Sequence, residues 1–256
     1  MTIIDAVILG IVEGLSEFLP ISSTGHLILA ERIMGMASTE AVKSFDIVIQ
    51  LGAIAAVVLL YWRSLILSRR TLLLVIAGFI PTGLIGLAMH GIIRTYFLGN
   101  ITVVGWSLLL GGLFLVLFER LHREDPGATD ALEAITFRQA VIIGTFQAIA
   151  IIPGVSRSAA TIVGGLLLGL KRRTIVEFSF LLAVPTMLAA SGLDLLRAGP
   201  SLTAHDGMAI LIGFLTAFII AIFAVRWFLR FIQEHTFTSF GIYRIIVGIA
   251  ALVLWK

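Results

Sequence analysis

The chain has 256 residues, of which 59% are apolar and only 13% are charged, and its mean hydropathy is +1.09. Soluble domains carry charge on roughly a quarter of their residues, so this composition indicates an integral membrane protein. The absence of cysteine excludes disulfides, thiolate metal sites and cysteine nucleophiles, and a net charge of +3 without a basic run among exposed aromatics argues against nucleic-acid binding.

The first polar stretch, EGLSEFLPISSTGH at residues 13–26, lies inside an apolar segment. Its two glutamates argue against a removable signal peptide. Pro20 divides the segment into predicted helical arms at 6–18 and 24–35, because proline disfavours helix in the residue before it. Each arm would reach only about 20 Å, short of the roughly 30 Å hydrocarbon core. We therefore predict a re-entrant hairpin whose tip lies at membrane depth.

The rest of the chain predicts six membrane spans and a second hairpin. Pro153 divides this second hairpin into arms at 138–151 and 157–169, and a polar loop at 119–137 precedes it. The spans are expected at 43–62, 71–91, 101–118, 176–196, 208–229 and 240–255.

Matching residues indicate an internal repeat at offsets between 133 and 135. The pairs are Gly10 and Gly144, Glu13 and Gln147, Ser22 and Ser156, Phe45 and Phe178, and Gly78-Phe79 and Gly213-Phe214. Each half holds one hairpin and three spans, and an odd number of spans inverts the second half. The predicted fold is thus a single all-α polytopic membrane domain over 1–256: six transmembrane helices plus two re-entrant helical hairpins in an inverted-topology repeat, with repeat one at about 1–120 and repeat two at about 138–256.

Positive charges give the orientation. On this topology, eleven cationic residues fall on one face and five on the other, while Arg157 and Arg244 lie within the membrane. The larger group is Arg63, Arg69, Arg70, Arg120, Arg123, Arg138, Lys171, Arg172, Arg173, Arg226 and Arg230; the smaller is Arg32, Lys43, Arg94, Arg197 and Lys256. The positive-inside rule then puts both termini outside the cytoplasm.

The first hairpin carries groups that suit catalysis. Glu13 and Glu17 are spaced i,i+4 on one helical face, which suits a divalent cation (Mg²⁺ or Ca²⁺) or a base; a solvated helix end is the alternative. A hydroxyl among Ser22, Ser23 and Thr24 could cap the following helix, but the three together also offer a nucleophile. His26, one turn on, is either an acid or base for that nucleophile or a packed core residue.

The second hairpin carries groups that suit an anion. Ser156, Arg157, Ser158 and Thr161 follow Pro153-Gly154 at a predicted helix start, where free N–H groups, hydroxyls and a guanidinium favour a group of phosphate geometry. Alternatively, Arg157 is the structural ion-pair partner of Glu13 or Glu17.

Together the two motifs resemble the undecaprenyl pyrophosphate phosphatase family, also called the bacitracin-resistance protein family. The resemblance extends to FDIVIQLG at 45–52, GGLLLGL at 164–170 and EFSFLLAVP at 177–185, so it spans nearly the whole chain. It implies a hydrolase of the bacterial inner membrane that converts the polyprenyl lipid undecaprenyl diphosphate to its monophosphate and inorganic phosphate for cell-wall synthesis. It also implies a divalent cation and an active site open to the periplasmic side.

The resemblance assigns roles to individual positions. Glu13 and Glu17 match the acidic motif, which places the cation there, Ser23 and His26 match the serine-histidine motif, and three residues match the phosphate-binding motif: Ser156, Arg157 and Thr161. Ser22, Thr24 and Ser158 are further hydroxyls for the phosphate. Ala159 stands where the family often has glycine, which removes no functional group.

Several alternatives stay open at this point. The base that deprotonates Ser23 is either His26 or Glu17, and direct attack by water is a further route. A lipid flippase or transporter shares the inverted repeat and broken helices. The other lipid phosphatase class needs a histidine after the Ser-Arg pair, but the next histidine after Arg157 is His205, so that possibility fails. A homodimer is compatible with the sequence.

Overall fold

The computed structural model describes residues 1–37, 39–97, 99–198 and 207–255, and it describes the side chains of these residues except those of 90, 93–96 and 195–198. Within these ranges the chain is helical and has no named strand. The predicted all-α class is therefore confirmed. His205 and Lys256 lie outside the described residues, as do the side chains of Arg94 and Arg197 in the charge comparison.

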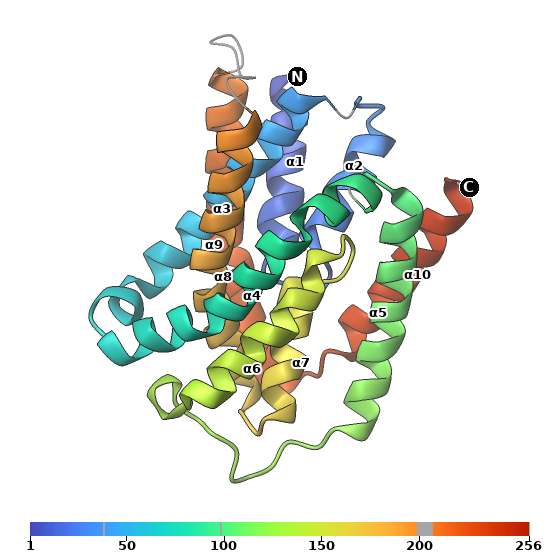
Figure 1. Ribbon diagram of the computed structural model, residues 1–256. Coiled ribbons are helices and arrows are strands. Elements are labelled where there is room, and N and C mark those ends of the chain that lie inside the picture. The colour runs from blue at the N-terminus through green and yellow to red at the C-terminus, as the bar shows by residue number, and fades with distance from the viewer. Residues whose placement is uncertain (38, 98, 199–206, 256) are drawn as a thin grey trace.

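The first half of the chain folds into two short helices followed by three long ones (Figure 1). They are α1 (Ile3–Ser16), α2 (Ser23–Ile33), α3 (Glu40–Ile66), α4 (Arg69–Tyr96) and α5 (Ile101–Leu121). A capping box formed by Thr2 and Asp5 starts α1, and Pro20 lies in the turn that follows. The short helices α1 and α2 thus agree with the predicted arms 6–18 and 24–35 to within three residues.

The second half repeats this order of short and long helices. Its α-helices are α6 (Phe137–Ala148), α7 (Arg157–Leu167), α8 (Arg172–Ala198), α9 (Gly207–Glu234) and α10 (Thr238–Leu254), and its 3₁₀ turns are η1 (Leu132–Ala134) and η2 (Ile149–Ile151). A capping box formed by Thr136 and Gln139 starts α6. The helix tightens into η2 just before Pro153, and Gly154 follows in the left-handed region at φ 88°.

Among the described residues, five helices are long and apolar enough to cross a bilayer, which makes the protein a multi-pass membrane protein. They are Glu40–Ile66, Arg69–Met89, Ile101–Leu121, Arg172–Asp194 and Gly207–Glu234, and they correspond to five of the six predicted spans. The sixth predicted span, 240–255, is the apolar helix α10, which has 17 residues and would reach about 26 Å.

The helices of the two halves pack against one another rather than forming two separate bundles. The short helix α1 packs on α9, and the short helix α6 packs on α4. The long helix α3 packs on both α8 and α9, and α8 also packs on α4. At the edge of the molecule, α5 and α10 lie side by side (Figure 1). Both hairpins are therefore held by helices from the opposite half.

Glycines let the short helices approach the long ones closely. A Cβ atom on Gly10 would lie 2.8 Å from the carbonyl oxygen of Gly213, and one on Gly144 would lie 1.8 Å from the carbonyl oxygen of Gly78. No side chain fits at such distances. The four residues are those that the sequence repeat aligned, Gly10 with Gly144 and Gly78 with Gly213.

Aromatic packing anchors the first turn in the core. Phe18, fully buried beside Pro20, packs edge-on against Phe180 of α8 with ring centroids 5.3 Å apart. Phe180 in turn lies 6.2 Å from Phe228 of α9. The turn that carries the glutamates and serines is therefore fixed to two long helices.

Candidate functional site

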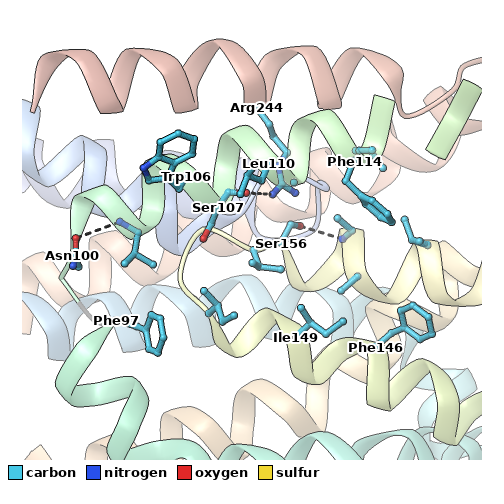
Figure 2. A pocket seen from close by; sticks show the side chains of 18 of the residues that line it. Phe97, Asn100, Trp106, Ser107, Leu110, Phe114, Phe146, Ile149, Ser156 and Arg244 are labelled. Atoms are coloured by element: carbon cyan, nitrogen blue, oxygen red, sulfur yellow. Dashed lines mark hydrogen bonds between the residues drawn. The ribbon is translucent and has the colours of Figure 1, made fainter. Parts of the chain in front are cut away.

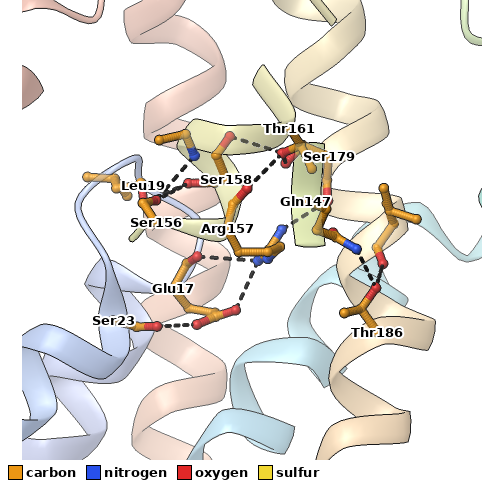
Figure 3. A network of polar contacts seen from close by, with 12 residues as sticks. Glu17, Leu19, Ser23, Gln147, Ser156, Arg157, Ser158, Thr161, Ser179 and Thr186 are labelled. Atoms are coloured by element: carbon orange, nitrogen blue, oxygen red, sulfur yellow. Dashed lines mark hydrogen bonds and ion pairs between the residues drawn. The ribbon is translucent and has the colours of Figure 1, made fainter. Parts of the chain in front are cut away.

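The start of α7 in the second hairpin contacts the turn of the first hairpin, residues 17–22, within a group of connected polar side chains (Figure 3). Ser158 of α7 donates a hydrogen bond of 2.8 Å to the carbonyl oxygen of Leu19 in the first turn. Arg157 also reaches this turn, where its Nη2 donates to the carbonyl oxygen of Glu17 at 3.3 Å. The two polar stretches, far apart in sequence, thus form one site.

The carboxylate of Glu17 is the centre of this site. Ser23 donates its hydroxyl hydrogen to Oε2, while Arg157 Nη2 lies 2.9 Å from Oε1 (Figure 3). The side chains of Glu17 and Arg157 are only 3% and 11% exposed. Low local dielectric strengthens such charge-assisted bonds, so the Ser23 hydroxyl is held and polarised by a carboxylate.

Arg157 has one N–H donor, Nε, that is not used in its contacts with the described residues. Nη1 donates to the carbonyl oxygen of Ser179 at 3.0 Å, and the guanidinium lies 5.7 Å from the ring centroid of Phe18. Its Nε, although buried, has no hydrogen-bond partner among the described residues. A buried donor left unpaired is costly, so this atom marks unused capacity to bind an anion.

Glu13 is a buried acid whose carboxylate oxygens are not used as acceptors by the described residues. It is fully buried one helical turn before Glu17, and neither carboxylate oxygen has a hydrogen-bond partner in the part of the chain that the structure describes. Its aligned counterpart Gln147 instead donates to the hydroxyls of Thr82 and Thr186, each at 2.9 Å. An unpaired buried carboxylate is expensive unless a cation or a proton meets it.

The start of α7 is built around hydroxyls. Ser156 is the N-cap and accepts a hydrogen bond from the backbone N–H of Ala159, and its hydroxyl also bonds that of Ser158 at 3.1 Å. Thr161 lies 2.6 Å from the hydroxyl of Ser179 and donates toward the carbonyls of Arg157 and Ser158. These hydrogen bonds fix the first turn of α7, which begins at Arg157.

Ser22, the residue before α2, does not cap that helix. It occupies the N-cap position, yet its side chain makes no cap bond and its backbone is left-handed at φ 75°. The hydroxyl cap that the sequence suggested there is therefore not formed, and a hydroxyl cap that the sequence did not predict is seen at Ser156, at the start of α7. A non-glycine residue with positive φ stores local strain and is common at functional sites. Thr24 is half-buried beside the buried Ser23.

Both ring nitrogens of His26 bond to groups other than the Ser23 hydroxyl. Its Nδ1 lies 2.7 Å from the carbonyl oxygen of Ser22, and its Nε2 lies 2.9 Å from the hydroxyl of Tyr243, whose ring stacks on it at 5.5 Å. Because a carbonyl can only accept, Nδ1 must carry the proton. Of the two candidate bases for Ser23, Glu17 is the one that contacts it.

Arg244 has a place at the site that the sequence did not predict. It is 1% exposed, and its guanidinium donates to three carbonyl oxygens: Pro20 at 3.3 Å, Ser107 at 3.1 Å and Gly154 at 3.1 Å. It therefore ties the first turn to the second and to α5. The only signal in the sequence was an arginine inside an apolar segment, which shows its cost but not its partners.

Comparison with known proteins identifies the family of this chain. The family model described as bacitracin resistance protein BacA matches residues 6–250. An undecaprenyl-diphosphatase of Aquifex aeolicus (strain VF5) is 50% identical over 249 residues, which are 97% of each chain. Proteins of the same name from Sulfurihydrogenibium sp. (strain YO3AOP1) and Persephonella marina (strain DSM 14350 / EX-H1) are 48% and 47% identical; the alignments cover 97% and 99% of this chain and 98% and 99% of theirs. The chain therefore belongs to the bacitracin resistance protein BacA family.

Proposed function

We propose that this protein hydrolyses undecaprenyl diphosphate to undecaprenyl phosphate and inorganic phosphate, which recycles the lipid carrier of peptidoglycan synthesis. The observation that carries the proposal is the Ser23–Glu17–Arg157 arrangement, where a buried hydroxyl donates to a carboxylate beside a guanidinium with a free N–H. A pure carrier needs no hydroxyl held in this way. Phosphoryl transfer, in contrast, requires mainly positioning and charge stabilisation, which these groups provide.

The second hairpin provides the phosphate grip. Arg157 offers its unpaired Nε, and the first turn of α7 offers backbone N–H groups and a favourable dipole. Ser156 is near enough to join them. Ser158 and Thr161 already bond protein groups, which supports a role in holding Arg157. Direct phosphate contacts by Ser22, Thr24, Ser158 and Thr161 remain predictions.

The reaction follows from the bond between Ser23 and Glu17. Ser23 passes its proton to Glu17 and its oxygen attacks the terminal phosphorus, while the bond to the bridging oxygen breaks and undecaprenyl phosphate leaves. Water then hydrolyses the phosphoserine, which yields inorganic phosphate and restores the hydroxyl. Direct attack by water with Glu17 as base is the alternative. His26 positions the Ser22 backbone through its Nδ1 rather than contacting the nucleophile.

The acidic pair fits a divalent cation. Within the described residues no group of three or more His, Asp or Glu gathers as a metal site, but Mg²⁺ characteristically binds one or two carboxylates and completes its shell with water and substrate phosphate. Glu13 has both oxygens free for this and Glu17 lies one turn away. Bound there, a cation such as Mg²⁺ or Ca²⁺ would neutralise diphosphate charge.

The topology we propose keeps the six spans, the two re-entrant hairpins and the inverted repeat. Two facts support it. Exchanging the halves maps the α1–α9 contact onto α6–α4, and α3–α9 onto α8–α4. It also maps the Gly10–Gly213 contact onto Gly144–Gly78. The charge bias supports our proposal that both termini lie outside the cytoplasm, and we propose that the site opens toward the periplasm.

Phosphate release by the purified protein tests the function. In detergent, with no membrane and no gradient, wild-type protein is expected to release inorganic phosphate from undecaprenyl diphosphate, and EDTA is expected to stop the release until Mg²⁺ or Ca²⁺ is restored. A flippase or transporter would release none. Turnover that continues unchanged in EDTA would refute the cation site while leaving the phosphatase intact.

A further inference from the structure

A cavity of about 600 Å³ lies between α5 and the second hairpin (Figure 2). The hairpin contributes η2 and α7 to one wall, and α5 forms the other. We call this cavity the α5 groove. Its described lining is almost wholly apolar, and Arg244 is the one charged residue in it. Such a groove is unsuited to a diphosphate but suited to hydrocarbon.

The α5 groove lies next to the proposed phosphate-binding residues at the turn of the second hairpin, residues 152–156. Ser156 lines the groove and also caps α7 directly before Arg157. Arg244 lines it too, while bonding the carbonyls of Pro20 and Gly154 in the two turns. Figure 2 shows Ser156, Ser107 and Arg244 together at its middle. For a molecule whose charged head is held at Arg157, the groove is the apolar space next to it on the side of Ser156.

The two ends of the groove differ. Asn100 lies at one end together with Phe97, whereas Phe114 and Phe146 lie at the other, apolar end (Figure 2). Phe114 is 55% exposed in a helix long and apolar enough to span the membrane, so this end opens toward lipid. A hydrocarbon chain would follow the apolar end into the bilayer.

We propose that the α5 groove holds the first isoprene units of the substrate's prenyl chain and leads the rest of the chain into the bilayer past Phe114. The inference rests on the proposed function, which supplies the prenyl diphosphate. The volume lies in the roughly 300–1,000 Å³ range of small-molecule pockets, so the groove takes part of a long chain. A prenyl chain leaves lipid rather than water, so its burial adds little hydrophobic energy. The groove orients the diphosphate instead.

Two leucines of α5 give a matched test. Leu110 lines the groove and is 57% exposed, whereas Leu113, one turn further, is 49% exposed and outside it. Both positions face lipid, so a tryptophan at either should be tolerated by the fold. Leu110→Trp fills the path of the chain, and Leu113→Trp adds the same bulk outside it.

The readout is kcat/KM for phosphate release from isopentenyl, farnesyl and undecaprenyl diphosphate, a series of increasing chain length. Leu110→Trp is expected to lower the value for undecaprenyl diphosphate by about tenfold or more, with a smaller loss for each shorter chain, because a misdirected chain misplaces the reacting phosphate. Leu113→Trp should match wild type throughout. An equal loss on all substrates, or equal behaviour of both variants, would overturn the groove assignment.

Photolabelling separates this inference from the catalytic one. A polyprenyl diphosphate with a diazirine in its first isoprene units is expected to label peptides of α5 and α7, and excess undecaprenyl diphosphate should prevent the labelling. Phe223 of α9 faces lipid and serves as the reference position. Equal labelling of Phe223 would contradict binding of the prenyl chain in the α5 groove. Labelling that the competitor leaves unchanged would contradict it as well. If wild-type protein releases no phosphate, the proposed function fails while the labelling still decides the binding site.

Discussion

The carboxylate of Glu17 has two partners, one on each of its oxygens. It accepts a hydrogen bond from Ser23, the proposed nucleophile, and pairs with Arg157, so it links the two hairpins. In the proposed mechanism, arriving phosphate competes for Arg157 and leaves Glu17 free to take the proton. Glu13 and Gln147 show that the repeat is unequal: one half kept a free carboxylate, and the other has an amide bonded to Thr82 and Thr186.

Arg244 gives a prediction at the residue scale. Arg244→Lys keeps the charge but cannot span three carbonyls with one ammonium, and each buried acceptor that loses its donor costs about 1–3 kcal/mol. We expect kcat to fall by about tenfold or more. The exposed Arg226→Lys in α9 should leave kcat unchanged. Phosphate-release kinetics on folded, monodisperse protein check this, and wild-type kcat in Arg244→Lys would contradict the tie between the turns.

At the scale of elements, the sequence predicted the short helices well because prolines mark their ends. Pro20 and Pro153 lie between the arms, and the predicted arm boundaries differ from the observed ones by at most three residues. Proline disfavours helix locally, but Pro81 and Pro185 lie inside α4 and α8, so a proline predicts a break here only together with the polar residues beside it. The hydroxyl cap was harder to predict, because Ser22 adopts a strained left-handed backbone that its aligned partner Ser156 does not.

Contacts between distant elements could not be predicted. His26 contacts Tyr243, which lies 217 positions later in the chain, and Arg244 contacts Pro20, which lies 224 positions earlier. Such pairs depend on how α10 packs on α5 and beside the turns, which no periodicity specifies. The sequence did offer Glu17 as a base for Ser23 and as a partner for Arg157, because charge complementarity limits the choices for a buried ion.

The close contact between α6 and α4 predicts a stability effect. A methyl group at Gly144 meets the backbone of Gly78, so Gly144→Ala must displace a helix, and overpacking of this kind costs about 1–3 kcal/mol or more. Gly192→Ala in α8 is the control, because an added Cβ there has no atom of the described residues within 4 Å. Thermal unfolding in detergent should show a lower midpoint for Gly144→Ala only. Equal unfolding midpoints for both variants would contradict the close contact between Gly144 of α6 and Gly78 of α4.

For the whole molecule, the two halves form one body in which each hairpin is held by the other half. The exchange of α1–α9 with α6–α4 under the repeat is the main support for an inverted arrangement. Such an arrangement brings broken helices together away from either surface, where their polar turns can face a shared cavity. The site thus belongs to neither half alone.

Orientation is testable with single cysteines because the chain has none of its own. Ala37 and Ala131 are both exposed, and the proposed topology puts Ala37 outside the cytoplasm and Ala131 in the cytoplasmic loop. A membrane-impermeant maleimide added to intact cells should label Ala37→Cys at once and Ala131→Cys only after permeabilisation. The reverse order would invert the topology and move the opening of the site to the cytoplasm.

The central claim is that the two turns form one phosphatase site in which Ser23 attacks the terminal phosphorus with Glu17 as its base. Its most direct test is mass spectrometry of the Ser23 peptide after acid quenching during turnover of undecaprenyl diphosphate, together with the turnover of Ser23→Ala. We predict a phosphate ester on Ser23 and no phosphate release by Ser23→Ala, whereas Ser191→Ala, which removes a buried hydroxyl outside the network, should keep wild-type turnover. An unmodified Ser23 peptide with full turnover in Ser23→Ala would contradict the account.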